Sequence, residues 1–390
     1  MKHFSLPLLG ILLALFLPSL ASGKSLKEQA LPDSLAPGLE HLTALISTEK
    51  GRRLELDKIE TVLSFIQKRK PENTLYYPEK KFNSTSIYFE FDIRTDLENI
   101  LKYTYNPNIP AEAVMPASLR SSVWKNTAKD QKCPALLWNS LDNLKSPVEV
   151  NGSEYTVISP DIHTGAYYGY DQDRKLILCS YQGKKLFISL SRQKDRSEVG
   201  KKGLVLGSDY DWNYIYSGEK GINLPGLGWV SSYMYDSCTI IIYYETDPGK
   251  PLVRCAVFKW LRAGWSNLNM VKKTHLYKGL IRHKNCLKEV LEHPLLPRPE
   301  ILENSFAEFK NKSTEALRTE IRKYFDYLCA RYRNDKKLKK TKYAKLLKNK
   351  NYLLTLSRTE MLAILSKEYI KNILGKENRH TARLSKINSR

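Results

Sequence analysis

The segment that decides the fold reads LILCSYQGKKLFISL over residues 176–190. It holds two short apolar runs joined by Gln182 and Gly183, which is the pattern of a β-hairpin. Further along, residues 239–244 read TIIIYY, a nearly continuous apolar run that predicts a strand buried on both faces. Both runs predict a mostly antiparallel sheet at the centre of the chain.

Outward from this segment, strand patterns recur between turn residues over residues 146–292, and this spacing favours a β-rich core domain built as a sandwich or barrel. Residues 24–145 predict a mixed helical region with one strand. Residues 293–375 predict a helical basic domain, and a basic tail follows over residues 376–390. We therefore expect an α+β fold in which a central, mostly antiparallel β domain is flanked by an N-terminal mixed helical region and a C-terminal basic helical region.

Helix boundaries are marked in three places. Thr95 with Glu98 and Ser357 with Glu360 each have the spacing of a capping box, in which the two side chains bond each other's backbone N–H groups. Gly375 follows the last apolar stripe, where a C-cap glycine ends a helix.

The first 23 residues predict a signal peptide. Lys2 and His3 precede an apolar run over residues 4–20, and small residues follow, so cleavage after Ala21 or Gly23 is expected. An uncleaved membrane anchor is the alternative, but spanning a bilayer needs roughly 20 apolar residues and this run has 17. We therefore expect a secreted or periplasmic protein.

Export changes how the cysteines are interpreted, because oxidising compartments favour disulfide bonds. The chain has six cysteines, an even number, and their pairing stays open. Buried free thiols are the alternative. The six are Cys133, Cys179, Cys238, Cys255, Cys286 and Cys329.

The charge is strongly basic and concentrated at one end. The formal net charge is +22, of which residues 301–390 carry +14 (23 basic against 9 acidic side chains). Residues 331–350 alone hold ten basic side chains against one acidic, which predicts an anionic polymer or a membrane surface as a partner. A solvated basic face is the alternative, and specific nucleic-acid binding is not expected. The anion-binding residues predicted here are Lys336, Lys337, Lys339 and Lys340.

Aromatic side chains gather around a glycine-rich loop at residues 218–228. On one strand face such rings could stack on a carbohydrate or grip a peptide, while the alternative is that they fill the interior of the β domain. The ligand-binding residues predicted on this basis are Trp212, Tyr214, Tyr216, Trp229, Tyr233 and Tyr235.

Motifs for catalysis, a cofactor or a metal are absent from the sequence, including GxSxG, HExxH and the P-loop. Asp209, Asp211 and Asn213 alternate like the start of a calcium loop, but Tyr214 stands where glycine is required. His275, His283, Cys286 and His293 lack a closed zinc-ligand spacing. We expect no cofactor and no metal site, and whether the protein is an enzyme stays open.

Two functions are compatible with these features. The first is an exported, non-catalytic binding or envelope-associated protein, with an aromatic β face for a ligand and a basic helical end for an anionic surface. The second is a secreted hydrolase acting on sugars or lipids, with its site in the loops of the β domain at Asp161, His163, Asp209 and Asp211.

Overall fold

The computed structural model describes residues 27–46, 52–71, 74–81, 83–125, 134–162, 164–224, 228–247, 249–335 and 352–376. Its centre is a nine-stranded sheet, in which only the pair β1–β2 at one edge is parallel. In spatial order the strands are β1 (Lys27–Ala30), β2 (Thr74–Tyr77), β3 (Thr85–Ile93), β14 (Val253–Gly264), β13 (Tyr233–Glu245), β8 (Lys184–Gln193), β7 (Gly169–Tyr181), β5 (Val148–Ile158) and β4 (Leu119–Lys125).

The predicted hairpin is confirmed as β7–β8, with Tyr181 opposite Lys184. Gln182 and Gly183 both have positive φ, of 51° and 75°. Two consecutive positive φ values are what a two-residue turn needs to match the right-handed twist of its strands. Glycine adopts such a value without steric cost, so Gly183 is essential to this turn.

Helices cover both faces of the sheet, and side chains that alternate along each strand separate two cores. Leu176 and Leu178 of β7 belong to one core, and Ile177 and Cys179 to the other. The β13 run over residues 239–244 is buried on both faces, as its composition predicts. The helices on the Ile177 side are α1 (Ala36–Ala44) and α2 (Glu60–Gln67), and those on the Leu176 side are α3 (Leu97–Thr104), α4 (Ala111–Val114), α5 (Ala135–Asn139) and α6 (Lys273–Leu291).

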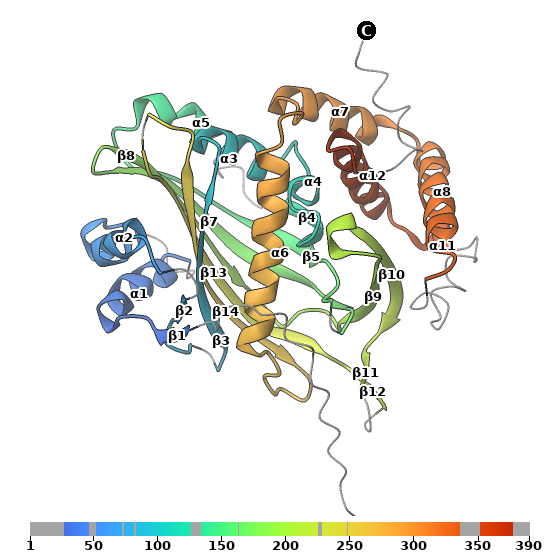
Figure 1. Cartoon of the computed structure of the whole chain (residues 1–390), viewed down its shortest axis with the longest axis horizontal. Helices are drawn as coiled ribbons and strands as arrows, with labels where there is room; N and C mark the ends of the chain where they lie inside the picture. The colour runs from blue at the N-terminus through green and yellow to red at the C-terminus, as the bar shows by residue number, and fades with distance from the viewer. Residues whose placement is uncertain are drawn as a thin grey trace, which may run out of the picture.

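Smaller elements stand beside the main sheet. A second sheet has the order β10 (Asn213–Lys220), β9 (Lys201–Leu206), β6 (Ala166–Tyr167), and a third pairs β11 (Ile222–Leu224) with β12 (Gly228–Val230). The C-terminal helices are α7 (Pro299–Asn311), α8 (Thr314–Arg331), α11 (Tyr352–Thr355) and α12 (Arg358–Ile373) (Figure 1). Leu206 and Ile215 of the second sheet share a core with α8, α11 and α12, while α7 packs into the core on the Leu176 side of the main sheet. Short 3-10 turns occur at Asp33–Leu35, Asp57–Ile59, Leu141–Asn143 and Asp209–Asp211.

The predicted fold class is confirmed, because the chain has a central, mostly antiparallel sheet with helical regions on both sides of it in sequence. The β-strands of residues 24–145 nevertheless join the same sheet as those of residues 146–292, since β3 pairs with β14 and β4 with β5. The sheet is one open sheet packed between helices. The domain boundaries themselves stay a prediction.

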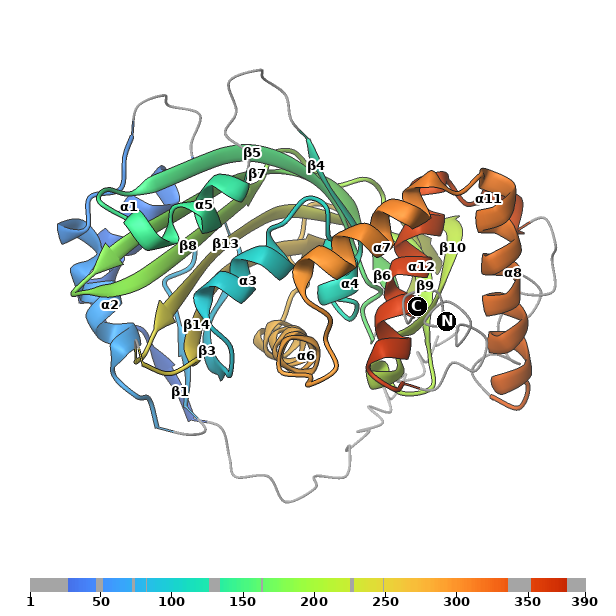
Figure 2. The same cartoon turned by 90° about the horizontal axis from the view of Figure 1, so that it is seen from above.

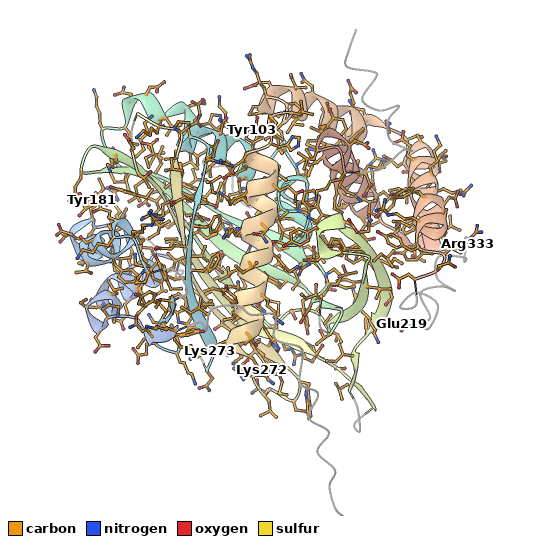
Figure 3. All side chains as sticks on the ribbon, viewed as in Figure 1. Tyr103, Tyr181, Glu219, Lys272, Lys273 and Arg333 are labelled. Atoms are coloured by element: carbon orange, nitrogen blue, oxygen red, sulfur yellow. The ribbon has the colours of Figure 1, made fainter. Side chains whose placement is uncertain are left out.

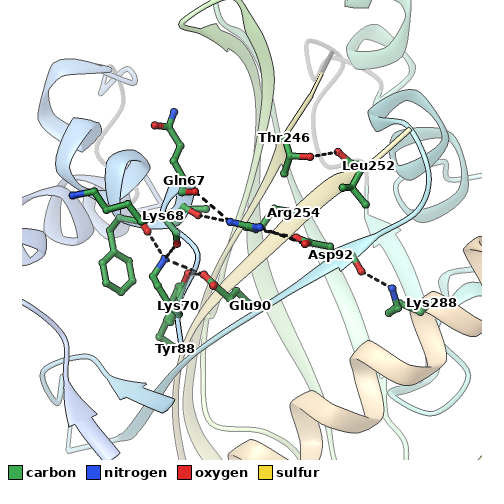
Figure 4. A network of polar contacts seen from close by, with 12 residues as sticks. Gln67, Lys68, Lys70, Tyr88, Glu90, Asp92, Thr246, Leu252, Arg254 and Lys288 are labelled. Atoms are coloured by element: carbon green, nitrogen blue, oxygen red, sulfur yellow. Dashed lines mark hydrogen bonds and ion pairs between the residues drawn. The ribbon is translucent and has the colours of Figure 1, made fainter. Parts of the chain in front are cut away.

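A polar network fastens the helices to one end of the sheet (Figure 4). Arg254 on β14 donates to Asp92 Oδ1 on β3 at 2.8 Å and to the backbone oxygen of Ile66 in α2 at 3.2 Å. From the other face, Lys288 on α6 donates to the backbone oxygen of Asp92 at 2.5 Å. Residues far apart in sequence thus hold α2 and α6 against neighbouring strands.

Candidate functional site

A cavity of about 980 Å³ lies between the sheet and α6. Seen from above, the sheet curves around α6, so one of its faces is concave toward the helix (Figure 2). A volume of this size is at the upper end of the range of small-molecule sites. The walls come from the strands β4, β5, β7, β8, β13 and β14, from α6, and from the segment that joins α3 to β4.

Much of the wall is apolar. The sheet contributes Ile241 and Val257, which are opposite each other on β13 and β14. Leu276 and Leu280, one helical turn apart on α6, face them from the other side of the core. Gly279 lies between them on the same helix, and a Cβ atom placed there would meet nothing within 4 Å. The missing side chain leaves room beside the helix.

A row of polar side chains crosses this concave face. Lys259 on β14 is opposite Thr239 on β13, and Thr239 is opposite Ser191 on β8. Ser191 is in turn opposite Arg174 on β7, and all four residues line the cavity. Because neighbouring strands are about 4.8 Å apart, the backbones of Lys259 and Arg174 are about 14 Å from each other, with two hydroxyl residues between them.

The cation at the β7 end of the row is fully compensated. Arg174 donates to both carboxylate oxygens of Glu154, with Nη2–Oε2 at 2.7 Å and Nε–Oε1 at 3.0 Å, and to Ser189 Oγ at 3.0 Å. Gln172 donates a further hydrogen bond to Glu154 Oε2 at 2.8 Å. A bidentate pair of this kind fixes both side chains, so this end of the row is rigid.

The cation at the β14 end has no such partner. Lys259 Nζ donates to Thr239 Oγ1 at 3.1 Å and to Ser237 Oγ at 3.4 Å, and it forms no ion pair with the residues that the structure describes. Burial lowers the pKa of Lys259 to about 8, because the charged form is poorly solvated there. The ammonium therefore faces the cavity with two neutral hydroxyls as its partners.

Four buried polar atoms in the cavity wall have no hydrogen-bond partner among the described residues: Thr104 Oγ1, Trp124 Nε1, Trp265 Nε1 and His283 Nε2. A buried polar group without a partner costs about 1–3 kcal/mol. Each of these four atoms has less than 1 Å² of accessible surface, so neighbouring atoms cover it from the cavity. The polar part of the wall is therefore the row of side chains from Lys259 to Arg174.

His283 lies on α6, one turn beyond Gly279. Its Nδ1 is 3.4 Å from Ser118 Oγ. Burial, with a further contribution from the charge of Lys259, lowers the pKa of His283 to about 4, so the imidazole is neutral at pH 7. When Ser118 donates to Nδ1, the hydrogen of the ring is on Nε2, which makes that atom a buried donor.

Exposed apolar and basic side chains lie at the rim. Ile162 and Met270 both line the cavity, and their side chains are 42% and 51% exposed. Lys272, immediately before the start of α6, and Lys278 line the same opening (Figure 3). The cavity thus opens beside the first turns of α6.

The predicted aromatic residues are not in the cavity wall. Trp212, Tyr214 and Tyr216 are buried, with at most 3% of each exposed, so they fill the interior, which was the alternative interpretation. The guanidinium of Arg120 lies 4.0 Å above the ring of Tyr216. These three rings form no exposed stacking face in this structure.

Tyr233 and Tyr235 are half-buried, and their ring centres lie 6.1 Å apart. Arginine side chains cover both rings, Arg196 at 4.2 Å and Arg262 at 5.0 Å. A ligand-binding role for these two tyrosines stays a prediction. The side chain of Trp229 lies outside the described residues, as do Lys336, Lys337, Lys339 and Lys340.

The acidic residues considered for catalysis or calcium are mostly engaged elsewhere. Asp209 accepts from Arg282 Nη2 at 2.8 Å, and Asp211 caps its own turn by accepting from the backbone N–H of Ser208 at 3.0 Å. Asp161 lines the cavity, and His163 lies outside the described residues. In the described part of the chain, three or more His, Cys, Asp or Glu residues nowhere form a group that could hold a metal ion.

The buried cysteines of the sheet and α6 carry free thiols in this structure, and these are Cys179, Cys238, Cys255 and Cys286. Burial raises the pKa of Cys286 to about 12. Cys133 lies outside the described residues, so disulfide bonding of the chain stays a prediction. A search of the described helices finds none that is long and apolar enough to cross a membrane.

Sequence reasoning missed the residues that give the cavity its chemistry. Lys259 interrupts the apolar β14 run VFKWL at residues 257–261, and a lysine in the middle of a buried strand was the available signal. Gly279 inside a long helix was a second signal, because glycine weakens a helix and a mid-helix glycine often has a packing or functional reason.

Comparison with known proteins gives little to add to this geometry. No family model matches the chain, and no curated protein matches it either. Among solved structures, the search finds a similarity to the human StarD13 (DLC2) lipid transfer and protein localization domain. The two chains share 10% sequence identity, the match covers 60% of this chain and 94% of that chain, and the TM-score is 0.26. At that TM-score the likeness carries no weight for fold or function.

Proposed function

We propose that the chain is a non-catalytic binding protein that encloses one small amphipathic molecule in the cavity between α6 and the sheet. The observation that carries the proposal is the cavity itself, of about 980 Å³, with largely apolar walls that a row of polar side chains crosses. A ligand that replaced water there would release the apolar walls from hydration, at roughly 25 cal/mol for each Å² covered.

The binding function fits the cavity better than the hydrolase does. Hydrolysis of a glycoside needs two carboxyl groups facing each other across a cleft. In the cavity wall, Glu154 is held by Arg174, and burial raises the pKa of Glu112 to about 7. Asp209, on the other side of α6, is held by Arg282. A carrier needs no such pair, because its only task is to exclude water and match the ligand.

A binding experiment with a neutral apolar dye tests this function. Nile red is titrated into the protein after solvent extraction, and its fluorescence is expected to rise and saturate near one dye per chain. Gly279→Trp and Gly279→Leu place a side chain over the cavity and are expected to weaken binding, the larger residue more strongly. Ala307→Trp, on an exposed position of α7, is the matched control and should bind as the wild type does.

Two outcomes would overturn the binding function. One is an extracted protein that neither binds the dye nor yields a small molecule in the extract. The other is binding that the two Gly279 variants leave unchanged while both remain folded by circular dichroism.

The place of action belongs to the same proposal. We infer that the protein is exported and that residues 331–350 meet an anionic surface, on the basis of the leading apolar segment and the ten cations. Sequencing the N-terminus of the natural protein tests export, since cleavage would leave residue 22 or 24 first. Sedimentation with vesicles containing phosphatidylglycerol tests the surface, with Lys336, Lys337, Lys339 and Lys340 changed to Gln as the comparison.

A further inference from the structure

Lys259 is unusual among the buried lysines of this fold. Lys367 of α12 also forms no ion pair with the described residues, but it lies over the ring of Tyr214 at 4.7 Å and does not line the cavity. Lys175, on the opposite face of the sheet, reaches Glu149 at 2.9 Å, and Lys371 of α12 reaches Glu368 at 2.9 Å. A buried ammonium ordinarily has such a counter-charge, because its own desolvation is expensive. Lys259 has none among the described residues, and it lines the cavity.

The donor geometry at Lys259 is incomplete. A lysine ammonium has three N–H donors, and the hydroxyls of Ser237 and Thr239 accept from two of them. One N–H is left over. This unused, charged donor belongs to a residue that lines the cavity.

The acidic groups of the wall do not balance this charge. Glu154 is committed to Arg174 through two hydrogen bonds. Glu112 is buried in α4 and accepts from the backbone N–H of Ser122 at 3.2 Å. Asp161 accepts from Thr164 Oγ1 at 3.4 Å, and it is not among the charges that shift the pKa of Lys259. A cationic ligand would therefore meet Lys259 as a like charge, and a neutral ligand would leave the ammonium without a counter-charge.

We infer that the ligand enclosed in the cavity carries an anionic oxygen group, a carboxylate or a phosphate, which accepts from Lys259 Nζ. This inference rests on the proposed binding function and specifies the chemical class of its ligand. The apolar part of the ligand lies along Ile241, Val257 and the leucines of α6. The hydroxyls of Thr239 and Ser237 hold the ammonium in position.

Three ligands with one chain and different head groups test the inference: dodecanoate, dodecyl phosphate and 1-dodecanol. Each displaces Nile red from the wild type, from Lys259→Met and from Lys250→Met at pH 7. Methionine keeps the length and apolar stem of lysine without its charge, and Lys250 is an exposed lysine that serves as the control. The pair of acids also separates a carboxylate from a phosphate source of the anion.

We expect at least one of the acids to bind the wild type about tenfold to a hundredfold more tightly than the alcohol does, since a hydrogen bond to a charged group is worth that factor. Lys259→Met should abolish this preference, and Lys250→Met should keep it.

The outcomes separate the two proposals. Equal affinity for the alcohol and both acids, or a preference that survives Lys259→Met, overturns the anionic ligand and leaves the binding function standing. Failure of all three ligands to displace a dye that does bind also overturns the inference. Absence of any dye binding overturns the binding function, and the inference with it.

Discussion

Lys259→Met is expected to make the empty protein more stable. In the wild type, folding moves an ammonium without a counter-charge from water to the wall of the cavity, where only Ser237 and Thr239 bond it. Methionine has nearly the same shape and no charge, so the variant avoids that desolvation. A residue kept for ligand binding at the expense of stability should behave in this way.

The size of the effect follows from the proton equilibrium. Burial lowers the pKa of Lys259 from 10.5 to about 8, a difference of 10.5 − 8 = 2.5. At about 1.4 kcal/mol for each tenfold change in that equilibrium, the penalty at pH 7 is at most about 3 kcal/mol. Losing the two hydrogen bonds leaves two hydroxyls less well satisfied, which offsets about 1–2 kcal/mol. The net gain expected is about 1–2 kcal/mol.

The sign of the pH dependence is fixed by the same shift. Between pH 8 and 10.5 the unfolded chain holds a proton on Lys259 that the folded chain has released, so the wild type gains stability as pH rises through this window. Below pH 8 the penalty is fully present. The advantage of Lys259→Met should therefore be largest at pH 7 and shrink by pH 10. Arg174 is charged at both pH 7 and pH 10, and His283, whose pKa burial lowers to about 4, is neutral at both, so neither group titrates in this window.

Urea unfolding of ligand-free protein at pH 7 and pH 10, followed by circular dichroism, measures this difference. Lys250→Met, at an exposed position, is the control and should change stability by less than about 0.5 kcal/mol. The reasoning is refuted if Lys259→Met is no more stable than the wild type at pH 7. It is also refuted if the advantage is the same at both pH values.

Three further predictions concern the walls of the cavity. Gly279→Ala should stabilise the protein by about 1 kcal/mol in urea unfolding, because the new Cβ atom meets nothing within 4 Å and alanine favours the helix over glycine. A loss of stability would show that the space beside residue 279 is not open. Glu154→Gln should destabilise the protein by about 3 kcal/mol, because it leaves the buried Arg174 without a counter-charge. The double variant Glu154→Gln, Arg174→Met should recover part of that loss. An unchanged unfolding midpoint for Glu154→Gln alone would contradict the pairing. The thiol of Cys286 should not react with Ellman's reagent at pH 8 until the protein is unfolded, because it is buried and its pKa is raised to about 12. Peptide mapping locates the thiols that react, and rapid reaction of Cys286 in the native protein would contradict its burial.

Local rules explain the parts of the fold that the sequence predicts. The β7–β8 hairpin follows from two apolar runs and the two turn residues between them. Ser357 and Glu360 form the predicted capping box at the start of α12, and Gly375 has the positive φ of a C-cap glycine. Each of these depends on residues within a few positions of one another, so periodicity and turn chemistry suffice.

One local prediction is wrong in detail. Thr95 was expected to cap the helix that begins at Leu97, but the cap is Asp96, whose carboxylate accepts from the backbone N–H of Asn99 at 2.7 Å. Aspartate and threonine are both good N-caps, and an aspartate one position later competes for the same N–H groups. The choice between neighbours is decided by how the chain leaves β3, which the local sequence does not specify.

The aromatic residues at β10 show the limit of composition. Trp212, Tyr214 and Tyr216 alternate in sequence as a binding face would, but Trp212 has a positive φ and precedes the strand, and all three rings are buried. A period of two predicts that Tyr214 and Tyr216 share one face. Whether that face meets solvent or another layer depends on Arg120 and on Lys367 of α12, which is more than 100 residues further along the chain.

The sequence by itself determined most strands of residues 146–292, the principal helices, the α+β class and the concentration of positive charge at the C-terminal end, because these depend on neighbours in the chain. It predicted one strand for residues 24–145, where the structure has β1, β2, β3 and β4. Only the tertiary structure decided that Lys259, Thr239, Ser191 and Arg174 form one row, because the spatial order β14–β13–β8–β7 joins strands separated by up to some 80 residues. The cavity exists because the sheet curves around α6, and curvature is a property of all its strands together. Composition cannot show whether a lysine has a counter-charge, since that depends on which side chains the fold brings within a few ångströms of it.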